Sequence, residues 1–247
     1  MGNNNILVTI TTVTLNSEKT LKRTIESVLN QTYPNIEYII KDGGSNDNTI
    51  KIAKSFSKKF EEKGYRFIIV SKKDHGMYDA LNQANELGEG IIVGNVNSDD
   101  YFEQDAVETM VDMFKKTNFD MAYANLRVIG KHRQKIKKAR LCKFVSSRYW
   151  NHPTTFIKRE VLIVEKYKCK SMYDDFDLML RLRKKYVVVI VDKVLSNFVF
   201  GGMSNKKSLR ETWKRIKLKN SIYRENGFSG IRYRVDTFLI EFAKLFF

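Results

Sequence analysis

Two adjacent carboxylates stand where an apolar stretch of the chain ends. The motif is Asn-Ser-Asp-Asp at residues 97–100, and it follows the apolar run at residues 90–94. Neighbouring carboxylates at the end of a buried strand repel each other unless a cation or hydrogen-bond donors compensate their charge. Mg²⁺ and Mn²⁺ accept such ligands, commonly one or two carboxylates completed by substrate phosphates. The motif predicts a divalent-cation site, and a turn that caps the following helix is an equal alternative.

A pair of glycines follows Asp42 directly after a second apolar run. Glycines let the backbone turn sharply and approach a ligand closely, while Asp42 projects from the expected strand end. Ser45 or Asn46 can cap the next helix, so a plain turn explains everything in this segment except Asp42. The chain contains neither the G-x-G-x-x-G nor the G-x-x-x-x-G-K-[ST] pattern. Dinucleotide-binding and P-loop sites are therefore disfavoured.

A third acidic group opens a segment with helical spacing of its apolar residues. It is Asp-Asp-Phe-Asp at residues 174–177. Carboxylates are favoured at a helix N-terminus by the helix dipole, which makes a cap the simpler interpretation. A carboxylate in that place could also serve as a general base toward a substrate bound in front of it.

The elements that must position these motifs alternate along the chain. Strands are expected at residues 6–10, 36–41, 66–71 and 90–94, and helices at 17–31, 47–60 and 77–87. Further helices are expected at 103–116, 161–168, 176–184 and 208–225, with strands at 120–129 and 187–191. Alternation with short loops predicts an α/β fold, a mostly parallel central sheet with helices on both faces. Ligands bind at the carboxyl ends of such strands, where the polar loops at 12–16, 42–47 and 97–100 lie.

The charge of the chain is unevenly distributed. The 247 residues carry a formal net charge of +16. Residues 1–130 hold 15 basic and 18 acidic residues, whereas residues 131–247 hold 29 and 10. The second half could therefore face nucleic acid, an anionic membrane surface or a phosphorylated substrate, and composition does not decide among them.

Cysteine usage and hydropathy suggest a compartment. Cys142 and Cys169 are the only cysteines, and neither belongs to a C-x-x-C pair, so free thiols are expected. The first residues show no basic and apolar signal regions, and no stretch approaches the roughly 18 apolar residues of a membrane span. A cytoplasmic protein is expected, peripheral at the inner face of the cell membrane if its basic half binds lipid.

Taken together and in this order, the motifs resemble those of family 2 glycosyltransferases, and in particular of bacterial polysaccharide-building members. The resemblance is carried by residues 8–16, 18–21, 24–33, 36–45, 74–82, 97–100, 174–182 and 200–204. Within it, residues 74–82 read Asp-His-Gly-Met-Tyr-Asp-Ala-Leu-Asn and residues 200–204 read Phe-Gly-Gly-Met-Ser. It spans about residues 6–205 and implies a GT-A fold.

The resemblance also implies roles for single residues. Those matching the donor-binding positions are Thr12, Asp42, Asp74, Asp79 and Asp99. Asp100 matches the ligand of Mg²⁺ or Mn²⁺, and Asp175 the catalytic base. Gly201, Gly202 and Ser204 match a loop that closes over the diphosphate. Two departures from the family pattern are Leu15, where many members carry Tyr near the nucleobase, and Asp174, where Glu is commoner.

His152 lies where the family often has a polar segment on the acceptor side. It belongs to the run Asn-His-Pro-Thr-Thr at residues 151–155. A lone His beside Pro is more often structural than functional, so both roles stay open.

The activity implied is an inverting, metal-dependent transfer of a hexosyl or N-acetylhexosaminyl group in bacterial surface-polysaccharide synthesis (O-antigen, capsule or exopolysaccharide). The donor would be a nucleotide-diphosphate sugar, a UDP-sugar being favoured, and the acceptor a hydroxyl of a glycan or of a lipid-linked molecule. A non-catalytic sugar-nucleotide-binding relative is the alternative. A basic nucleic-acid-binding protein ranks below both, because aromatic-interleaved RNA-binding and helix-turn-helix patterns are not evident.

We expect a glycosyltransferase domain over residues 1–205, with a nucleotide-binding half at 1–100 and an acceptor half at 101–205. Residues 206–247 form a basic, amphipathic helical extension. Its apolar residues repeat at spacings of three and four from Ile231 to Phe246. Binding to an anionic membrane and packing on the domain or on a second subunit are equal alternatives for this extension.

Overall fold

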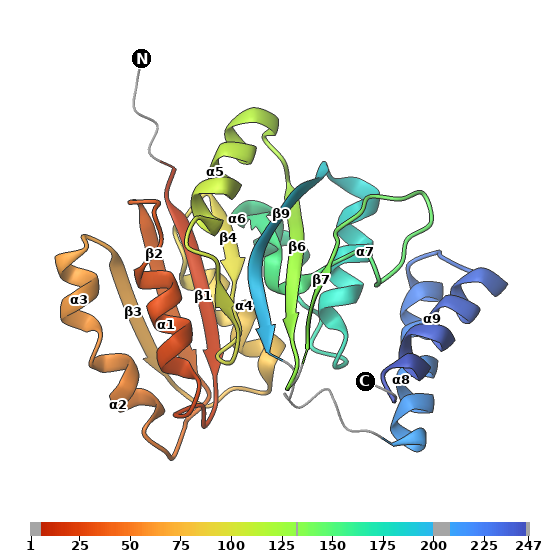
Figure 1. Ribbon diagram of the computed structural model, residues 1–247, viewed down its shortest axis with the longest axis horizontal. Coiled ribbons are helices and arrows are strands. Elements are labelled where there is room, and N and C mark those ends of the chain that lie inside the picture. Colours follow the sequence, from red (N-terminus) through yellow and green to blue (C-terminus); the bar gives the residue numbers. More distant parts are fainter. Residues whose placement is uncertain (1–5, 132, 200–207, 246–247) are drawn as a thin grey trace.

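A computed structural model describes residues 6–131, 133–199 and 208–245 (Figure 1). The strands are β1 (Val8–Thr14), β2 (Ile36–Asp42), β3 (Arg66–Ser71), β4 (Ile92–Asn95), β5 (Tyr101–Phe102), β6 (Met121–Ile129), β7 (Gln134–Lys137), β8 (Phe156–Lys158) and β9 (Val188–Val199). The α-helices are α1 (Leu21–Leu29), α2 (Thr49–Lys54), α3 (Ser57–Glu62), α4 (Met77–Leu87), α5 (Ala106–Thr117), α6 (Arg159–Glu165), α7 (Asp174–Lys185), α8 (Leu209–Glu225) and α9 (Ile231–Ala243). A short 3₁₀ helix, η1, spans His152–Thr154.

Within the described ranges, all strands belong to one sheet in the order β3-β2-β1-β4-β8-β6-β9-β5, with β7 beside β6. The pairs β1–β2, β2–β3 and β1–β4 are parallel. Every residue of β2 is buried, as expected of a strand that has helices on both sides. The carboxyl ends of these four strands lie at one edge of the sheet, so the loops that follow them converge.

The second half of the sheet is mixed. Strand β8 is antiparallel to β4 and β6, whereas β9 runs parallel to β6 and antiparallel to β5. Gly94 of β4 pairs with Phe156 of β8, and a Cβ on that glycine would lie 2.5 Å from the Phe156 ring. Only a residue without a side chain allows this close approach where the two halves join.

Two hydrophobic cores cover the opposite faces of the sheet. Neighbouring residues of β4 point to different cores, as the pleat of a strand requires. Ile92 belongs to the core that includes Ile25 of α1, and Val93 to the one that includes Leu81 of α4. Figure 1 shows α1 in front of the sheet and α4 behind it. The expected α/β fold with helices on both faces is confirmed.

Helices α8 and α9 pack on each other and on the α7 side of the domain, far from α2 and α3 (Figure 1). The Tyr223 hydroxyl donates a hydrogen bond to the Val145 carbonyl over 3.0 Å. Asp236 accepts one from Ser146 and lies 2.8 Å from the Arg148 guanidinium. Basic C-terminal helices were expected, and they dock on the segment before η1.

Helix α9 packs on the rest of the protein through polar side chains. The residues that α9 buries are Thr237 and Glu241, whereas Ile231, Val235 and Leu239 are exposed. Glu241 is fully buried because basic side chains of α8 surround it. An apolar stripe, here defined as Ile231, Val235 and Leu239, therefore faces outward.

Differences from the sequence-based expectation concern element bounds. Strand β1 continues to Thr14 instead of ending at residue 10, because its threonines are β-branched and fit a buried strand despite their hydroxyls. The helix expected at 47–60 is two helices, α2 and α3, separated at Ser55 and Phe56. The strands β5, β7 and β8 and most of β9 were not expected.

No helix in the described part of the chain has both the length and the apolarity needed to cross a bilayer.

Candidate functional site

Four loops meet at the carboxyl ends of β1 to β4. The backbone N–H of Asn16 donates to the Ser45 hydroxyl over 2.8 Å, and the Asn16 amide oxygen accepts from the backbone N–H of Asn46 over 2.9 Å. The hydroxyls of Ser17 and Ser98 lie 2.9 Å apart. The loops after β1, β2 and β4 are thus hydrogen-bonded to each other, as their polar residues led us to expect.

Asp42 is enclosed by donors of the protein. Its Oδ2 accepts hydrogen bonds from the backbone N–H groups of Gly44 and Ser45, both at 3.0 Å, and from the Ser71 hydroxyl at 2.7 Å. Burial alone would raise the pKa of Asp42, but the hydrogen bonds from Ser45, Ser71 and Gly44 outweigh it and hold that pKa below its ordinary value. Asp42 is therefore ionised, and it shapes the loop that follows β2.

Asp74 belongs to the loop after β3 and lies against the same turn. Its Oδ2 is 3.3 Å from the ammonium group of Lys41, a side chain that is 1% exposed. A Cβ on Gly43 would lie 2.8 Å from that oxygen, so a residue larger than glycine would displace the carboxylate. Asp79, in the first turn of α4, accepts hydrogen bonds at Oδ2 from the backbone N–H of His75 and the Gln83 amide, both at 2.9 Å. The two carboxylates fix the loop between β3 and α4.

Thr12 lies in β1 and is fully buried. Its hydroxyl accepts a hydrogen bond from Tyr38 over 2.9 Å. Its direct contact with a nucleotide stays a prediction, as it does for Asp42.

The carboxylates at the end of β4 are crowded. Burial first, and then the charge of Asp99, raise the pKa of Asp100 to about 7, against hydrogen bonds from Asn97 and Val199. The Asn97 amide donates to Asp100 Oδ2 over 2.8 Å, and the backbone N–H of Val199 donates to Oδ1 over 3.0 Å. Burial also raises the pKa of Asp99, which its own backbone N–H and the Arg23 guanidinium offset only in part. Positive charge near the pair therefore compensates its negative charge only in part.

A divalent cation would balance the negative charge of Asp99 and Asp100. Asp99 and Asp100 offer hard carboxylate oxygens whose ionised form a cation would stabilise. Among the residues that the structure describes, no group of three His, Cys, Asp or Glu side chains is arranged to hold a metal ion. The donor set thus suits a cation that takes its remaining ligands from a bound substrate.

Asp175 is distinguished from its acidic neighbours by what it contacts. Asp174 accepts hydrogen bonds from the backbone N–H groups of Lys170 and Ser171, both at 2.8 Å, and is buried. Asp177 pairs with Lys168 and Arg181. Both of these carboxylates hold the start of α7 in place, whereas Asp175 faces Tyr78 and His152.

The Asp175 carboxylate lies among Tyr78, His152 and the helix start. Its Oδ1 accepts hydrogen bonds from the Tyr78 hydroxyl at 2.9 Å and from the backbone N–H of Phe176 at 2.8 Å. Its Oδ2 is 4.0 Å from His152 Nδ1. Burial lowers the pKa of His152, and the charge of Asp175 offsets this only in part, so the imidazole is neutral at pH 7. One oxygen of Asp175 is saturated and the other faces a neutral ring.

A hydrogen-bonded series connects His152 to the parallel strands. His152 Nε2 is 3.2 Å from the Tyr167 hydroxyl, which accepts from the Asn95 amide at 3.2 Å. Asn95, the last residue of β4, accepts in turn from the Thr11 hydroxyl. His152 is thus a buried member of a polar network beside Asp175, and sequence reasoning alone had left its role open.

Sequence reasoning did not assign Tyr78, Tyr167, Lys41 or Arg23. Tyr78 lies inside the 74–82 motif, so the motif itself could have directed attention to it. Tyr167 and Lys41 carried no signal that separates them from ordinary core residues. The loop residues Gly201, Gly202 and Ser204 lie outside the described residues.

Comparison with known proteins identifies the family. Residues 9–186 match the family model described as Glycosyl transferase family 2. This chain belongs to that family. It is 28% identical over 258 aligned positions to chondroitin synthase of Escherichia coli, a match that covers 96% of this chain and 36% of the synthase. The chain therefore corresponds to about a third of that longer relative.

Solved structures of other proteins share the fold. TarS of S. aureus, residues 1–349 in complex with UDP-GlcNAc, superposes with a TM-score of 0.70 at 17% identity, covering 98% of this chain and 73% of that one. The mannosyltransferase PcManGT of Pyrobaculum calidifontis, in complex with GDP-Man and Mn²⁺, gives a TM-score of 0.67 at 16% identity, covering 98% and 70%. The expected GT-A fold is confirmed.

Proposed function

We propose that this chain is an inverting glycosyltransferase of bacterial surface-polysaccharide synthesis. It would move a hexosyl or N-acetylhexosaminyl group from a nucleotide-diphosphate donor to a hydroxyl of a glycan or lipid-linked acceptor. The observation that carries the proposal is Asp175, whose Oδ1 is held by two donors while Oδ2 has no hydrogen bond among the described residues. A carboxylate oriented in this way suits a general base.

The donor is assigned to the four loops at the strand ends. In our proposal Thr12, Asp42, Asp74 and Asp79 act there chiefly by shaping the walls, because their polar atoms already have protein partners. A UDP-sugar is favoured, and the TarS complex with UDP-GlcNAc supports that choice. PcManGT is bound to GDP-Man, so the fold accommodates other bases too.

Asp100 would hold Mg²⁺ or Mn²⁺ together with oxygens of the donor diphosphate, and Asp99 beside it would bind the donor. When bound, such a cation stabilises the negative charge that develops on the leaving nucleoside diphosphate. The Mn²⁺ in the PcManGT complex and the unbalanced carboxylate charge of this chain support the assignment.

The transfer itself needs one base and one displacement. Asp175 Oδ2 takes the proton of the acceptor hydroxyl as that oxygen bonds to the anomeric carbon. The bond from that carbon to the diphosphate oxygen breaks on the opposite face, and its electron pair leaves with the nucleoside diphosphate. A single displacement inverts the anomeric centre and forms no covalent intermediate with the enzyme.

Substitution of the base tests the proposal. Donor binding is measured by calorimetry with UDP-GlcNAc, UDP-glucose and GDP-mannose in the presence of Mn²⁺, and turnover as release of the nucleoside diphosphate. Asp175→Asn should bind the donor as the unaltered chain does and lose turnover by about 100-fold or more. The matched control is Asp112→Asn, at an exposed position of α5, which should keep both.

Two outcomes would contradict the proposal. Full turnover by Asp175→Asn would remove Asp175 as the base. Donor binding by the unaltered chain without release from any donor, even with glycan or lipid-linked acceptors added, would favour a non-catalytic sugar-nucleotide-binding protein.

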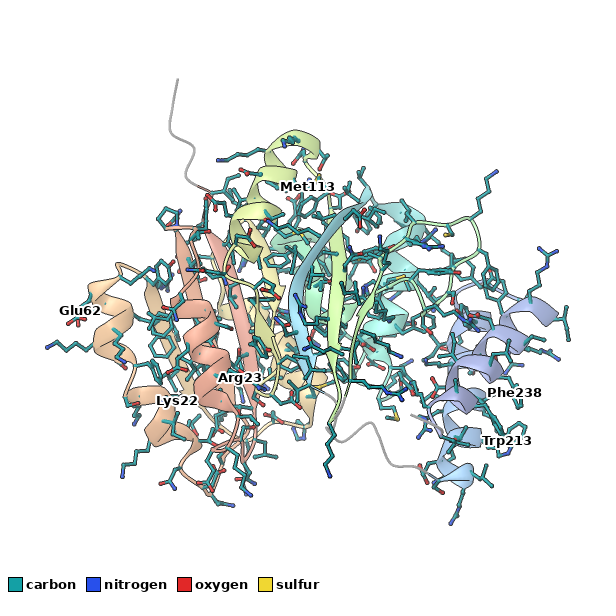
Figure 2. The ribbon with its side chains drawn as sticks, in the orientation of Figure 1. Lys22, Arg23, Glu62, Met113, Trp213 and Phe238 are labelled. Carbon is teal, nitrogen blue, oxygen red and sulfur yellow. The ribbon has the colours of Figure 1, made fainter. Side chains whose placement is uncertain are left out.

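We further propose that the α8–α9 end lies against the anionic inner face of the cell membrane. A pocket of about 760 Å³ between α8 and the start of α9 is lined by Lys214, Lys217, Arg224 and Arg234, and no carboxylate is among its described lining residues. A groove of about 500 Å³ beside it contains the apolar stripe and Phe144. Figure 2 shows Trp213 and Phe238 on the outer side of the same two helices. Cations next to exposed apolar side chains suit anionic headgroups and acyl chains.

A further inference from the structure

The charge of Asp175 acts on five titratable side chains from four parts of the chain. They are Tyr78 of α4, His152 of η1, Lys137 of β7, and Tyr167 and Tyr173 from the segment between α6 and α7. Only Tyr78 donates a side-chain hydrogen bond to Asp175 within the described residues. Lys137 instead donates to the carbonyls of Ser147 and Trp150. The orientation of the carboxylate therefore depends on one hydroxyl and on the backbone of α7.

The hydroxyl of Tyr78 is held firmly. The residue is 6% exposed, and its ring stacks on that of Tyr167 with 5.2 Å between centroids. Its single proton has two acceptors, Asp175 Oδ1 at 2.9 Å and the Met172 carbonyl at 3.1 Å. The charged oxygen is the nearer and the stronger acceptor. Burial and then the charge of Asp175 raise the pKa of Tyr78, so it remains a donor over the working pH range.

We propose that Tyr78 positions the Asp175 carboxylate, an inference that rests on the proposed role of Asp175 as the base. By occupying Oδ1 together with the Phe176 N–H, Tyr78 directs Oδ2 toward the acceptor. The residue contributes through Asp175 and takes no proton itself.

The position of Tyr78 in the chain adds a consequence. It lies in the first turn of α4, beside Asp79, whose carboxylate holds the backbone of His75 in the loop after β3. The residue that orients the base is thus attached to a loop assigned to the donor. The residue that orients the proposed base and a residue of the proposed donor loop therefore lie in the same helical turn.

The test is Tyr78→Phe, which keeps the ring and removes only the hydroxyl. The chain is labelled with ¹³C in its aspartate carboxyl groups, and their resonances are followed by NMR as the pH is changed. The Asp175 resonance is identified because it is missing from the spectrum of Asp175→Asn, and its titration midpoint is then read. Loss of a hydrogen bond to a charged group changes the titration midpoint of that group by about 1–2 pH units. The Asp175 midpoint in Tyr78→Phe should therefore lie higher by about that amount. Where turnover is measurable, the acidic limb of its pH profile should move likewise, with KM for the UDP-sugar unchanged.

The matched control is Tyr123→Phe. Tyr123 is a buried tyrosine of β6 in the same core, and its hydroxyl donates to the Arg140 carbonyl at 2.9 Å. This control should leave the Asp175 midpoint where it is. An unmoved midpoint in folded Tyr78→Phe would overturn the proposal.

A second measurement keeps Tyr78 in place and so does not depend on folding of the variant. The ¹³Cζ resonance of Tyr78 should follow the titration of its carboxylate partner and lose that response in Asp175→Asn. A resonance that ignores the titration would also refute the contact. Full turnover by Asp175→Asn would instead refute the role of Asp175 as the base, without refuting its hydrogen bond with Tyr78. Failure of the proposed function can therefore be told apart from failure of the Tyr78 proposal.

Discussion

Asp99 and Asp100 are neighbours in the chain but differ in their surroundings. Arg23 donates a hydrogen bond to the Asp99 carbonyl over 2.7 Å, and its guanidinium stacks on Tyr101. Asp100 is fully buried, and its partners are the neutral donors Asn97 and Val199. If Asp100 is the metal ligand proposed above, a proton and a divalent cation would compete for it, since each relieves the same buried charge.

That competition predicts a pH dependence. The pKa of Asp100 is raised to about 7, so the carboxyl is mostly protonated below that pH and mostly ionised above it. Mn²⁺ binding in the presence of UDP should therefore weaken about tenfold between pH 8 and pH 6. Electron paramagnetic resonance of free Mn²⁺ measures it. Asp100→Asn should bind weakly at both pH values, and equal affinity of the unaltered chain at pH 6 and pH 8 would contradict the assignment.

At the residue scale, the sequence predicted where acidic motifs occur better than it predicted which side chains they contact. It identified three acidic residues within residues 174–177, yet only the three-dimensional contacts show that Asp174, held by Lys170 and Ser171, and Asp177, held by Lys168 and Arg181, are structural. The Tyr78–Asp175 hydrogen bond joins residues 97 positions apart, and no local pattern encodes such a contact.

At the scale of elements, the docking of α9 depends on a buried carboxylate. Glu241 Oε1 is 2.6 Å from the Lys219 ammonium and 2.9 Å from that of Lys244, and Oε2 is 2.9 Å from Arg215 Nε. Burial would raise the pKa of Glu241, but the charges of Lys219 and Lys244 outweigh it and lower the pKa to about 2. Removal of the acid would leave buried cations without their counter-charge.

We expect Glu241→Gln to destabilise the chain by about 3 kcal/mol or more, measured by urea unfolding at pH 7. The pH dependence has a definite sign. A lowered carboxyl pKa contributes stability above its ordinary value, and that stability is lost as pH falls from about 4.5 to about 2. Roughly 3 kcal/mol should disappear over that range in the unaltered chain and not in the variant.

The matched control is Glu211→Gln on α8. Glu211 lies 2.8 Å from Lys214 in an exposed pair, so its loss should cost less than about 1 kcal/mol. Equal stability of the two variants would show that Glu241 does not anchor α9.

The elements themselves were predictable where hydrophobic periodicity was strong. Strands β2 and β3 and helix α4 fall where apolar runs and spacings placed them. The short strand β7, Gln134–Lys137, is basic and mostly exposed, so it carries no apolar pattern. The buried face of α9 was also unpredictable, because a charged cluster replaces the apolar contact that helices ordinarily bury.

At the scale of the whole molecule, the excess positive charge of residues 131–247 divides into two parts. Arg215 and Lys219 are buried around Glu241 and serve the packing of α8 and α9. Others, including Lys217 and Arg234, line the pocket at the outer end of the molecule. The buried Arg215 and Lys219 are not available to an anionic partner, so formal charge overstates the external field.

The membrane proposal predicts a specific loss of binding. The unaltered chain should sediment with vesicles of 70% phosphatidylcholine and 30% phosphatidylglycerol at low salt, and less so at high salt. Replacing two residues of the apolar stripe, Val235→Glu with Leu239→Glu, should reduce binding at least about tenfold. The control pair, Val164→Glu with Val187→Glu, changes exposed residues elsewhere by the same charge and should bind normally.

Absence of sedimentation by the unaltered chain at low salt would refute the membrane proposal. If analytical ultracentrifugation instead showed a dimer that only the stripe variant dissociates, the stripe would belong to a second copy of the chain.

The saturated carboxylate of Asp42 has a consequence for recognition. Its partners hold residues 43–45, and the missing side chain of Gly43 makes room for the Asp74 carboxylate. In the proposed donor site, a nucleotide would meet a wall whose polar groups are already paired, so little conformational entropy would be lost on binding. Selectivity among donors would then depend on how well the shape of the ligand fits this loop.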